Sequence, residues 1–433
     1  MNGHTMTLLS RLLAISVSTV CLFGAAQAET RLLTADAMLN VETGEVATGV
    51  GVLIEDGKVV SVGPLAAMSV PQGTETIDLR GYTIMPGMID MHVHLMGNTD
   101  NHGYAALGVS SHSDTIYGVV NAETTLMAGY TTVRNVGAGA YSDVALRDAI
   151  AEGAVPGPRM FVAGPAIGIT GGHCSDNNLL PAEYEAVGDG VADGPWAVRT
   201  KVRQNIKFGA DLIKTCSTGG VLSKGTKVGA PQYTLEELEA LVDEAHSHGL
   251  KVASHAHGAE GIYNALMAGV DTIEHSSFID DKGIALAREN GAYLSMDIYV
   301  TEYILGEGEA AGILEESLAK ERMVGHVQRT NFTKAHEAGV KMVFGTDAGV
   351  YPHGQNARQL SRMVRFGMTP LEALQATTIN AADALGKSDT IGSIQPGYFA
   401  DIIAVKGNPL EDVSLLEDVG FVMKEGVIYK PAE

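Results

Sequence analysis

The sequence predicts an α/β fold: a (β/α)8 TIM barrel that carries a small β-sandwich domain formed by the N- and C-terminal segments. Residues 83–385 of the 433-residue chain alternate apolar, strand-like runs with amphipathic stretches, and eight such alternations are typical of a barrel. Residues 29–82 and 386–433 instead hold short alternating runs broken by turns, including the hairpin signal Asp56-Gly57. Two all-β pieces at opposite ends of one chain suggest that they pair into one domain.

Residues 1–28 have the features of a cleavable export signal. Arg11 precedes an apolar run, and Ala26-Gln27-Ala28 fits a small-residue cleavage site. The run is shorter than the ~20 apolar residues that cross a bilayer, so we expect no membrane attachment once the signal is removed. The mature chain is expected to begin near Glu29, in the periplasm or outside the cell.

Charge and cysteine content narrow the classes of partner and site. A formal net charge of −22 argues against nucleic acid or an anionic membrane as the partner. Two cysteines remain after the signal, Cys174 and Cys216. They can form one disulfide in an oxidising compartment or remain free as small buried or loop thiols, and both alternatives stay open.

Eight apolar runs in residues 83–385 are predicted barrel strands, and the segments between them are predicted helices. In the stretch 234–249, Leu238, Leu241, Val242 and Ala245 form one apolar stripe of a helix. A doubly wound open sheet is the alternative, but it would not place ligand-type residues at the ends of so many strands. The predicted strands are TIMPGMIDMHVHL, YTTVRNV, RMFVAGPAI, DLIKTCS, LKVASHAH, DTIEHSS, AYLSMDIY and KMVFGTDAG.

The first predicted strand carries polar residues at every second place. Asp90, His92 and His94 alternate with apolar residues, so one face of the strand is polar and the other apolar. Two neutral imidazoles two residues apart on one face can both reach a single cation. In a barrel, functional residues gather at the C-terminal ends of the strands, where these histidines lie.

Four other predicted strands also end in residues that can bind a metal ion. A lone histidine of this kind is more often a hydrogen-bonded core residue, a lone lysine a surface residue and a lone aspartate a turn residue. Six of them at the mouth of one barrel indicate a metal centre. They are His92 and His94 on strand 1, Lys214 on strand 4, His255 on strand 5, His275 on strand 6 and Asp347 on strand 8.

With these motifs the sequence resembles the amidohydrolase superfamily of metal-dependent hydrolases over nearly the whole mature chain. The resemblance implies two divalent metal ions, usually zinc, one held by His92, His94 and Asp347 and the other by His255 and His275. It also implies that Lys214, carboxylated by carbon dioxide, bridges them. Two dications would repel an ammonium group with a pKa of about 10.4, whereas they stabilise an anionic carbamate.

Within the superfamily, the sequence looks most like the Xaa-Pro dipeptidase or carboxypeptidase-like branch, which is often labelled imidazolonepropionase-like. That branch includes hydrolases that cut the amide of ochratoxin A and release phenylalanine. Gly258 stands where mononuclear deaminases usually place a catalytic glutamate, so a deaminase is poorly supported. The likeness is carried by MPGMIDMHVHL, AGYTTVRNVG, ADLIKTCSTGGV, SHAHG and IEHSSF.

The resemblance also implies roles for further residues. Asp347 would act as general base and then as general acid. His257 and His173 would contact the substrate or its scissile carbonyl; a histidine that supports His255 and a surface histidine are the respective alternatives. Tyr233 matches a tyrosine that binds the substrate carboxylate in related dipeptidases, with a packing aromatic as the alternative. Three residues lie in loops where barrels build specificity: Ser217, Val221 and His353.

We therefore expect an exported amide hydrolase that removes the C-terminal amino acid from dipeptides or N-acyl amino acids. Its partner is a small-molecule or peptide substrate, and because relatives commonly self-associate, a homo-oligomer is expected. Hydrolysis of a cyclic amide or lactone on the same scaffold is the first alternative. A non-catalytic binding protein is the second, and the presence of all six ligand-type residues speaks against it.

Overall fold

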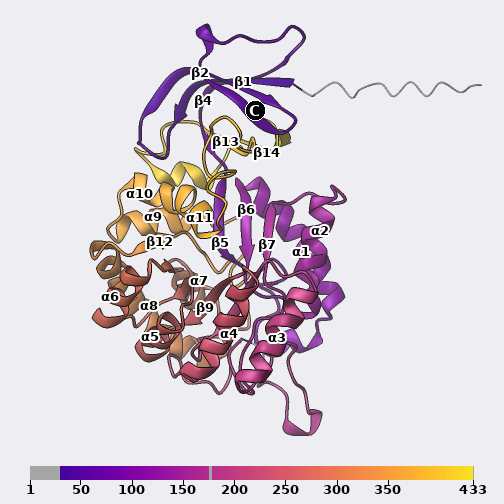
Figure 1. The fold of residues 1–433 in the computed structure, drawn as a ribbon, viewed down its shortest axis with the longest axis vertical. Helices are drawn as coiled ribbons and strands as arrows, with labels where there is room; N and C mark the ends of the chain where they lie inside the picture. Colours follow the sequence, from indigo (N-terminus) through magenta and orange to yellow (C-terminus); the bar gives the residue numbers. More distant parts are fainter. Residues whose placement is uncertain (1–29, 175–177, 433) are drawn as a thin grey trace, which may run out of the picture.

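The computed structural model describes residues 30–174 and 178–432, which form a small β-domain set on a larger α/β unit (Figure 1). The predicted export signal lies outside the described residues. No helix within the described ranges combines the length and the apolar character that a membrane span needs.

Eight parallel strands form the predicted barrel, which the structure confirms. They belong to two hydrogen-bonded sheets, β5-β6-β7 and β8-β9-β10-β11-β12. Parallel bridges between Ile167 and Thr215 and between Val93 and Ala348 join these two sheets at both edges, so the ring closes. The strands are β5 (Met88–Val93), β6 (Tyr130–Asn135), β7 (Arg159–Val162), β8 (Leu212–Cys216), β9 (Lys251–Ala256), β10 (Thr272–His275), β11 (Tyr293–Ser295) and β12 (Lys341–Val343).

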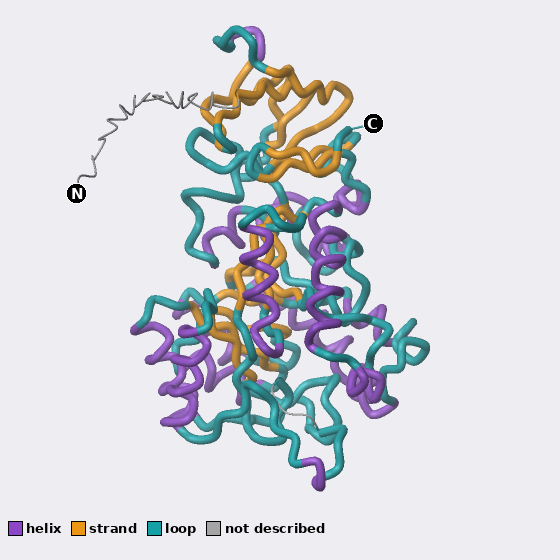
Figure 2. The backbone as a smooth tube through the Cα atoms, turned by 90° about the vertical axis from the view of Figure 1, so that its right-hand side faces the viewer, coloured by secondary structure: helices purple, strands orange, loops and turns teal. Residues whose placement is uncertain are grey.

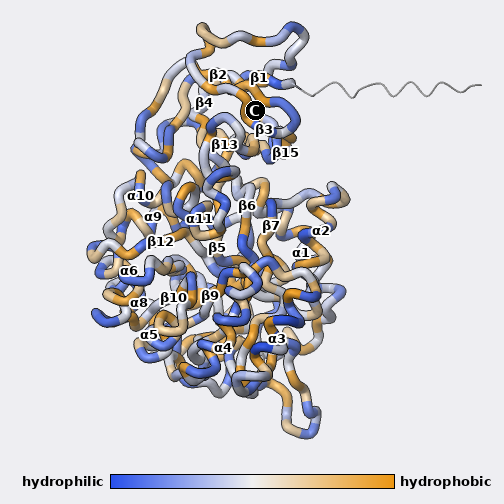
Figure 3. Tube along the Cα trace, viewed as in Figure 1, coloured by the Kyte–Doolittle hydropathy of each residue, from blue (hydrophilic) through white to orange (hydrophobic). Residues whose placement is uncertain are grey.

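Helices surround these strands (Figure 2) and carry both hydrophobic and hydrophilic residues along their length (Figure 3). In α4, the predicted stripe of Leu238, Leu241, Val242 and Ala245 is buried. Thr234 begins that helix with a capping box, which satisfies backbone N–H groups of its first turn. The helices are α1 (Ser111–Met127), α2 (Ser142–Ala151), α3 (Pro195–Lys207), α4 (Leu235–Ser247), α5 (Ala259–Met267), α6 (Asp281–Asn290), α7 (Val300–Gly306), α8 (Glu315–Glu337), α9 (Arg358–Arg365), α10 (Pro370–Ala376) and α11 (Ile379–Ala384).

Strands from both ends of the chain build the β-sandwich. They form one seven-stranded sheet, in the order β15-β14-β13-β4-β1-β2-β3, which encloses its own hydrophobic core. β13 pairs antiparallel with β4 and so joins the C-terminal segment to the N-terminal one. Asp56-Gly57, both with positive φ, form the predicted turn between β2 and β3. The strands are β1 (Thr30–Leu39), β2 (Val46–Glu55), β3 (Lys58–Pro64), β4 (Glu75–Pro86), β13 (Ile402–Val405), β14 (Phe421–Lys424) and β15 (Val427–Lys430).

The first barrel strand starts later than the sequence predicts. β4 runs to Pro86, so residues 83–86 pair with β13 in the sandwich and the barrel strand begins at Met88. The chain passes between the two sheets at Gly87, where a Cβ atom would lie only 2.1 Å from Oγ1 of Thr131. Because the apolar run continues across Gly87, the sequence did not show that the chain leaves the sandwich sheet and enters the barrel there.

Arg159, at the start of β7, links the barrel to the sandwich. Its Nη1 lies 2.5 Å from Oδ2 of Asp401 and its Nη2 lies 2.6 Å from Oε1 of Glu425. Asp401 is buried, so removal of Arg159 would leave a buried carboxylate without its ion pair. Such losses are costly because the charge has no solvent to stabilise it.

We expect Arg159→Met to lower the free energy of unfolding by about 2–4 kcal/mol, because Asp401 loses its cation. Urea denaturation followed by circular dichroism measures this change. Arg80→Met, which removes an exposed ion pair with Asp78, is the control and should leave stability unchanged. Equal stability of both variants would contradict this role of Arg159.

Candidate metal centre

The structure brings all six predicted metal ligands to one end of the barrel. Each comes from the C-terminal end of a strand or from the residues just after it, as the sequence predicted. Together they line one cavity of about 490 Å³, which is the volume of a small-molecule site. The six are His92, His94, Lys214, His255, His275 and Asp347.

One group of ligands surrounds Asp347. Its Oδ1 lies 3.4 Å from Nε2 of His92 and 3.3 Å from Nε2 of His94. The ligand atoms of His92, His275 and Asp347 all lie within 4.8 Å of one another. This spacing suits side chains that share a cation, because metal–ligand bonds of ~2 Å place the ligand atoms a few ångströms apart.

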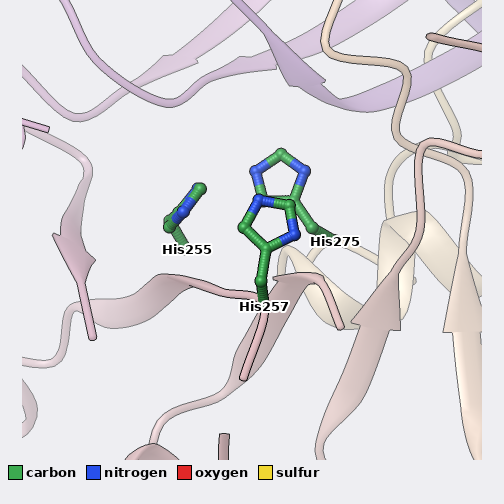
Figure 4. Close-up of side chains that lie close together, drawn as sticks. All are labelled: His255, His257 and His275. Atoms are coloured by element: carbon green, nitrogen blue, oxygen red, sulfur yellow. The ribbon is translucent and has the colours of Figure 1, made fainter. Parts of the chain in front are cut away.

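A second group consists of three histidines (Figure 4). The ligand atoms of His255, His257 and His275 also lie within 4.8 Å of one another. His275 belongs to both groups, so the two are adjacent rather than separate sites. His257 thus lies at ligand distance from the cluster, whereas the sequence predicted for it a substrate contact.

Strained backbone and a close approach place two of these side chains. His275 has a φ of 68° and Asp347 a φ of 58°, values that non-glycine residues adopt at a cost of about 1–3 kcal/mol and mainly at functional sites. Gly345, just after β12, passes so close to β5 that a Cβ atom would lie 2.9 Å from Cβ of His92. Only glycine lets these strand ends approach.

Buried carboxylates hold the outer ring nitrogens of two histidines. Nδ1 of His92 lies 2.9 Å from Oε2 of Glu274, and Nδ1 of His275 lies 3.0 Å from Oδ1 of Asp297. Arg134 donates to Glu274 at 2.6 Å. Although burial raises it, Arg134 and His92 hold the pKa of Glu274 well below its ordinary value. Carboxylates that engage Nδ1 leave Nε2 for a metal ion.

These supporting residues were not predicted from the sequence. A signal was present, because Arg134 and Glu274 are charged residues inside predicted barrel strands whose other residues are largely apolar. What they contact was not readable, since Arg134 reaches from β6 to Glu274 on β10.

Lys214 and His255 each carry a buried nitrogen that lacks a partner among the described residues. Nζ of Lys214 and Nε2 of His255 form no hydrogen bond. Burial lowers the pKa of Lys214 to about 8, which favours the neutral amine. Buried polar atoms are rarely left unsatisfied in proteins unless a ligand completes them. The donor set therefore fits a divalent metal site, and the neutral amine is the form that reacts with carbon dioxide.

His173 and Cys174 lie next to each other on one side of the cavity. The His173 ring lies 4.1 Å from the His255 ring, and its Nδ1 lies 2.7 Å from Oγ of Ser223. Cys174 is disulfide-bonded to Cys216, with a Cα–Cα distance of 5.8 Å. Whether these two cysteines pair could not be decided from the sequence, and the structure shows that they do. The disulfide ties the loop of His173 to the end of β8, two residues after Lys214.

Two of the predicted substrate contacts differ in their position. Val221 lines the cavity, whereas Tyr233 is not among the lining residues. The Tyr233 hydroxyl donates to the carbonyl of Ala192 at 2.7 Å, so it is occupied within the core. The prediction that Tyr233 binds the substrate carboxylate is therefore not supported by its placement.

Ser217 and His353 also lie outside the cavity lining. The hydroxyl of Ser217 is buried and lies 2.6 Å from that of Ser254. His353 lies 3.2 Å from Thr125 Oγ1 through Nδ1 and 3.2 Å from the His94 carbonyl through Nε2. Both residues therefore make contacts within the protein at the strand ends, and their role as substrate contacts stays a prediction.

Comparison with known proteins agrees with this geometry, since residues 83–430 match the amidohydrolase family. The chain belongs to that family. This amidohydrolase is 34% identical over 370 residues to ochratoxinase from Aspergillus niger. The match covers 80% of this chain and 75% of that protein.

Among solved structures, the amidohydrolase is similar to a Xaa-Pro dipeptidase with methionine bound in its active site. Sequence identity is 38%, the TM-score is 0.88, and the likeness covers 93% of this chain and 100% of that one. The A. niger ochratoxinase structure gives 31% identity and a TM-score of 0.84, over 93% and 96% of the two chains. The predicted family and fold are thus confirmed, and the protein is a hydrolase of amide C–N bonds.

We expect Lys214→Ala to lower the metal content of the purified protein, because the site loses a buried Nζ atom that has no partner among the described residues. Elemental analysis of the purified variant measures it. Lys424→Ala is the control, since Lys424 is also buried but lies on β14 of the sandwich, where its Nζ donates to the carbonyl of Gly157. A Lys214→Ala protein with full metal content would contradict the assignment.

Proposed function

We propose that this amidohydrolase releases the C-terminal amino acid from dipeptides or N-acyl amino acids, including ochratoxin A, with two zinc ions bound. The observation that carries the proposal is the gathering of six metal-type side chains in one cavity of about 490 Å³. His92, His94 and Asp347 would hold one ion, His255 and His275 the other, and carboxylated Lys214 both. The names of the ochratoxinase and dipeptidase relatives support the substrate class.

Asp347 is the proton carrier in this proposal. When bound, two divalent ions activate water and polarise the scissile carbonyl. Although burial raises it, His92 and His94 hold the pKa of Asp347 well below its ordinary value, so the group is an anion that can accept a proton. Asp347 takes the proton of the attacking water and then delivers it to the leaving nitrogen.

His173 is placed to donate a hydrogen bond to the substrate. Burial lowers its pKa to about 3, so the ring is neutral near pH 7. If the Ser223 hydroxyl donates to Nδ1, at 2.7 Å, the proton of the ring sits on Nε2. Because His173 lines the cavity, we expect that N–H to bind the carbonyl oxygen as it gains negative charge.

The cavity wall supports an apolar substrate side chain. Its lining is mainly aliphatic away from the metal ligands, and this is the lining expected for a proline or phenylalanine side chain. The aliphatic lining residues are Val136, Ala138, Pro165, Ala166, Val221, Leu222, Val300, Ile304, Val324 and Val350.

A substrate panel tests the proposed reaction. It contains Xaa-Pro and Xaa-Phe dipeptides, an N-acyl-phenylalanine, ochratoxin A, hydantoins and lactones, and free amino acid is measured by mass spectrometry. Release of proline or phenylalanine by the zinc-loaded enzyme is expected. Turnover of the cyclic compounds alone would replace the proposal with a cyclic amidase or lactonase.

We expect Asp347→Asn to lower kcat by about 100- to 10,000-fold, because an amide cannot carry the proton. The fold should be retained, as judged by circular dichroism. Glu244→Gln, in α4 where it pairs with Arg203 of α3 and does not line the cavity, is the control and should retain full activity. A near-normal kcat for Asp347→Asn would assign the proton transfer to another group.

The proposed enzyme is exported, which the pairing of Cys174 and Cys216 supports because disulfides persist in oxidising compartments. Expression of the full chain in a Gram-negative host should yield a periplasmic protein that begins near Glu29. N-terminal sequencing of the protein from the periplasmic fraction measures this. Recovery of an intact N-terminus from the cytoplasm would refute export.

A further inference from the structure

The cavity contains a buried carboxylate that the proposed chemistry does not use. Glu321, on α8, lines the cavity with only 3% of its surface exposed. Its Oε1 atom is shielded from solvent and has no hydrogen-bond partner. An unpaired buried carboxylate is unfavourable for folding, so packing alone does not account for it.

Thr301, on α7, is the polar side chain that packs beside Glu321. A Cβ atom on Gly325 would lie 3.0 Å from Oε1 of Glu321 and 2.7 Å from Oγ1 of Thr301. The glycine, one turn further along α8, thus lets both side chains pack closely against the helix, where a β-carbon would not fit. Oγ1 of Thr301 likewise has no hydrogen-bond partner. Burial raises the pKa of Glu321 to about 7, although Thr301 opposes the rise.

Among the described residues, the other carboxylates that line the cavity are already engaged. Asp347 lies among the metal ligands, and Asp297 accepts from Gln328 at 2.7 Å while it contacts His275. Asp189 accepts from the backbone N–H of Ala140 at 2.8 Å. Among these lining carboxylates, Glu321 is therefore the one that has no ion pair and has an oxygen without a hydrogen-bond donor.

The charge balance of the cavity also favours a cation at Glu321. Lys214 is the one lysine or arginine among the lining residues, and it lies within the metal ligands. Lys320, next to Glu321 in sequence, turns elsewhere, because its Nζ donates to the Ser223 carbonyl at 2.6 Å and pairs with Glu316. No ion pair of Glu321 is found in the described part of the chain.

Helix α8 connects this carboxylate to the metal end of the cavity. Nε2 of Gln328 donates to Oδ1 of Asp297 and to the carbonyl of His275. Oε1 of Glu321 lies beside Gly325, which is less than one helical turn from Gln328, or about 5 Å along the axis. A substrate whose carbonyl is bound at the metal ligands can therefore extend a second group to Glu321.

We propose that Glu321, with Thr301 beside it, binds a cationic nitrogen of the substrate. This inference rests on the proposed function and refines it: the preferred substrate carries either a free α-amino group or a basic side chain. Both sources supply the same ammonium-type chemistry, which the buried carboxylate would recognise through a charge-assisted hydrogen bond.

Four substrates distinguish the two sources: Ala-Phe against N-acetyl-Ala-Phe, and Ala-Lys against Ala-norleucine. In the zinc-loaded wild type, we expect kcat/KM to be about 10- to 100-fold higher for the cationic member of at least one pair. Glu321→Gln, which keeps the shape but not the charge, should remove that preference. Glu315→Gln, exposed on the same helix, is the control and should retain it.

Loss of the preference in the first pair alone assigns the subsite to the α-amino group, and loss in the second pair alone assigns it to a basic side chain. If Glu321→Gln fails to fold, the wild-type ratios decide, and ratios near one in both pairs overturn the proposal. Unchanged ratios in a folded Glu321→Gln enzyme overturn it as well, while the proposed function stands. No cleavage of any of the four would overturn this inference, whereas the proposed function is decided by the wider panel with Xaa-Pro dipeptides, the N-acyl-phenylalanine and ochratoxin A.

Discussion

Closure of the barrel between β12 and β5 is the constraint on which the site depends. Asp90 is fully buried at this seam and accepts hydrogen bonds from Oγ1 of Thr346 at 2.6 Å and Nδ2 of Asn356 at 2.8 Å. It also accepts from the backbone N–H groups of His92 and Thr346. One side chain therefore fixes the strand that carries the histidines against the loop that carries Asp347.

Much of the fold and of the metal cluster could be predicted because the signals are local. Period-two alternation placed His92 and His94 on one face, and the order of strands placed Lys214 and Asp347 at the same end of the barrel. The function of Asp90 could not be predicted, since Thr346 and Asn356, whose side chains donate hydrogen bonds to it, lie more than 250 residues away in the sequence. The alternation predicted that Asp90 shares a face with the histidines, whereas its hydrogen bonds hold β5 against the loop after β12.

The predicted substrate contacts differ in whether their side chains face the cavity, since Val221 lines it and three others do not. Tyr233, Ser217 and His353 sit in loops beside the site, but whether a loop side chain faces the cavity depends on acceptors that only the fold supplies. The carbonyl of Ala192, for example, accepts the hydrogen bond of the Tyr233 hydroxyl. Conversely, Glu321 lies in a helix without a sequence motif, so its burial beside the cavity could be found only from the structure.

The central claim is that one rim of the barrel holds two divalent ions among six converging side chains. Anomalous diffraction from crystals of the zinc-loaded protein, recorded on both sides of the zinc absorption edge, tests it directly. The account predicts two peaks about 3.5–4 Å apart, with extra density on Nζ of Lys214 between them. A single peak, or peaks away from His92 and His255, would contradict it.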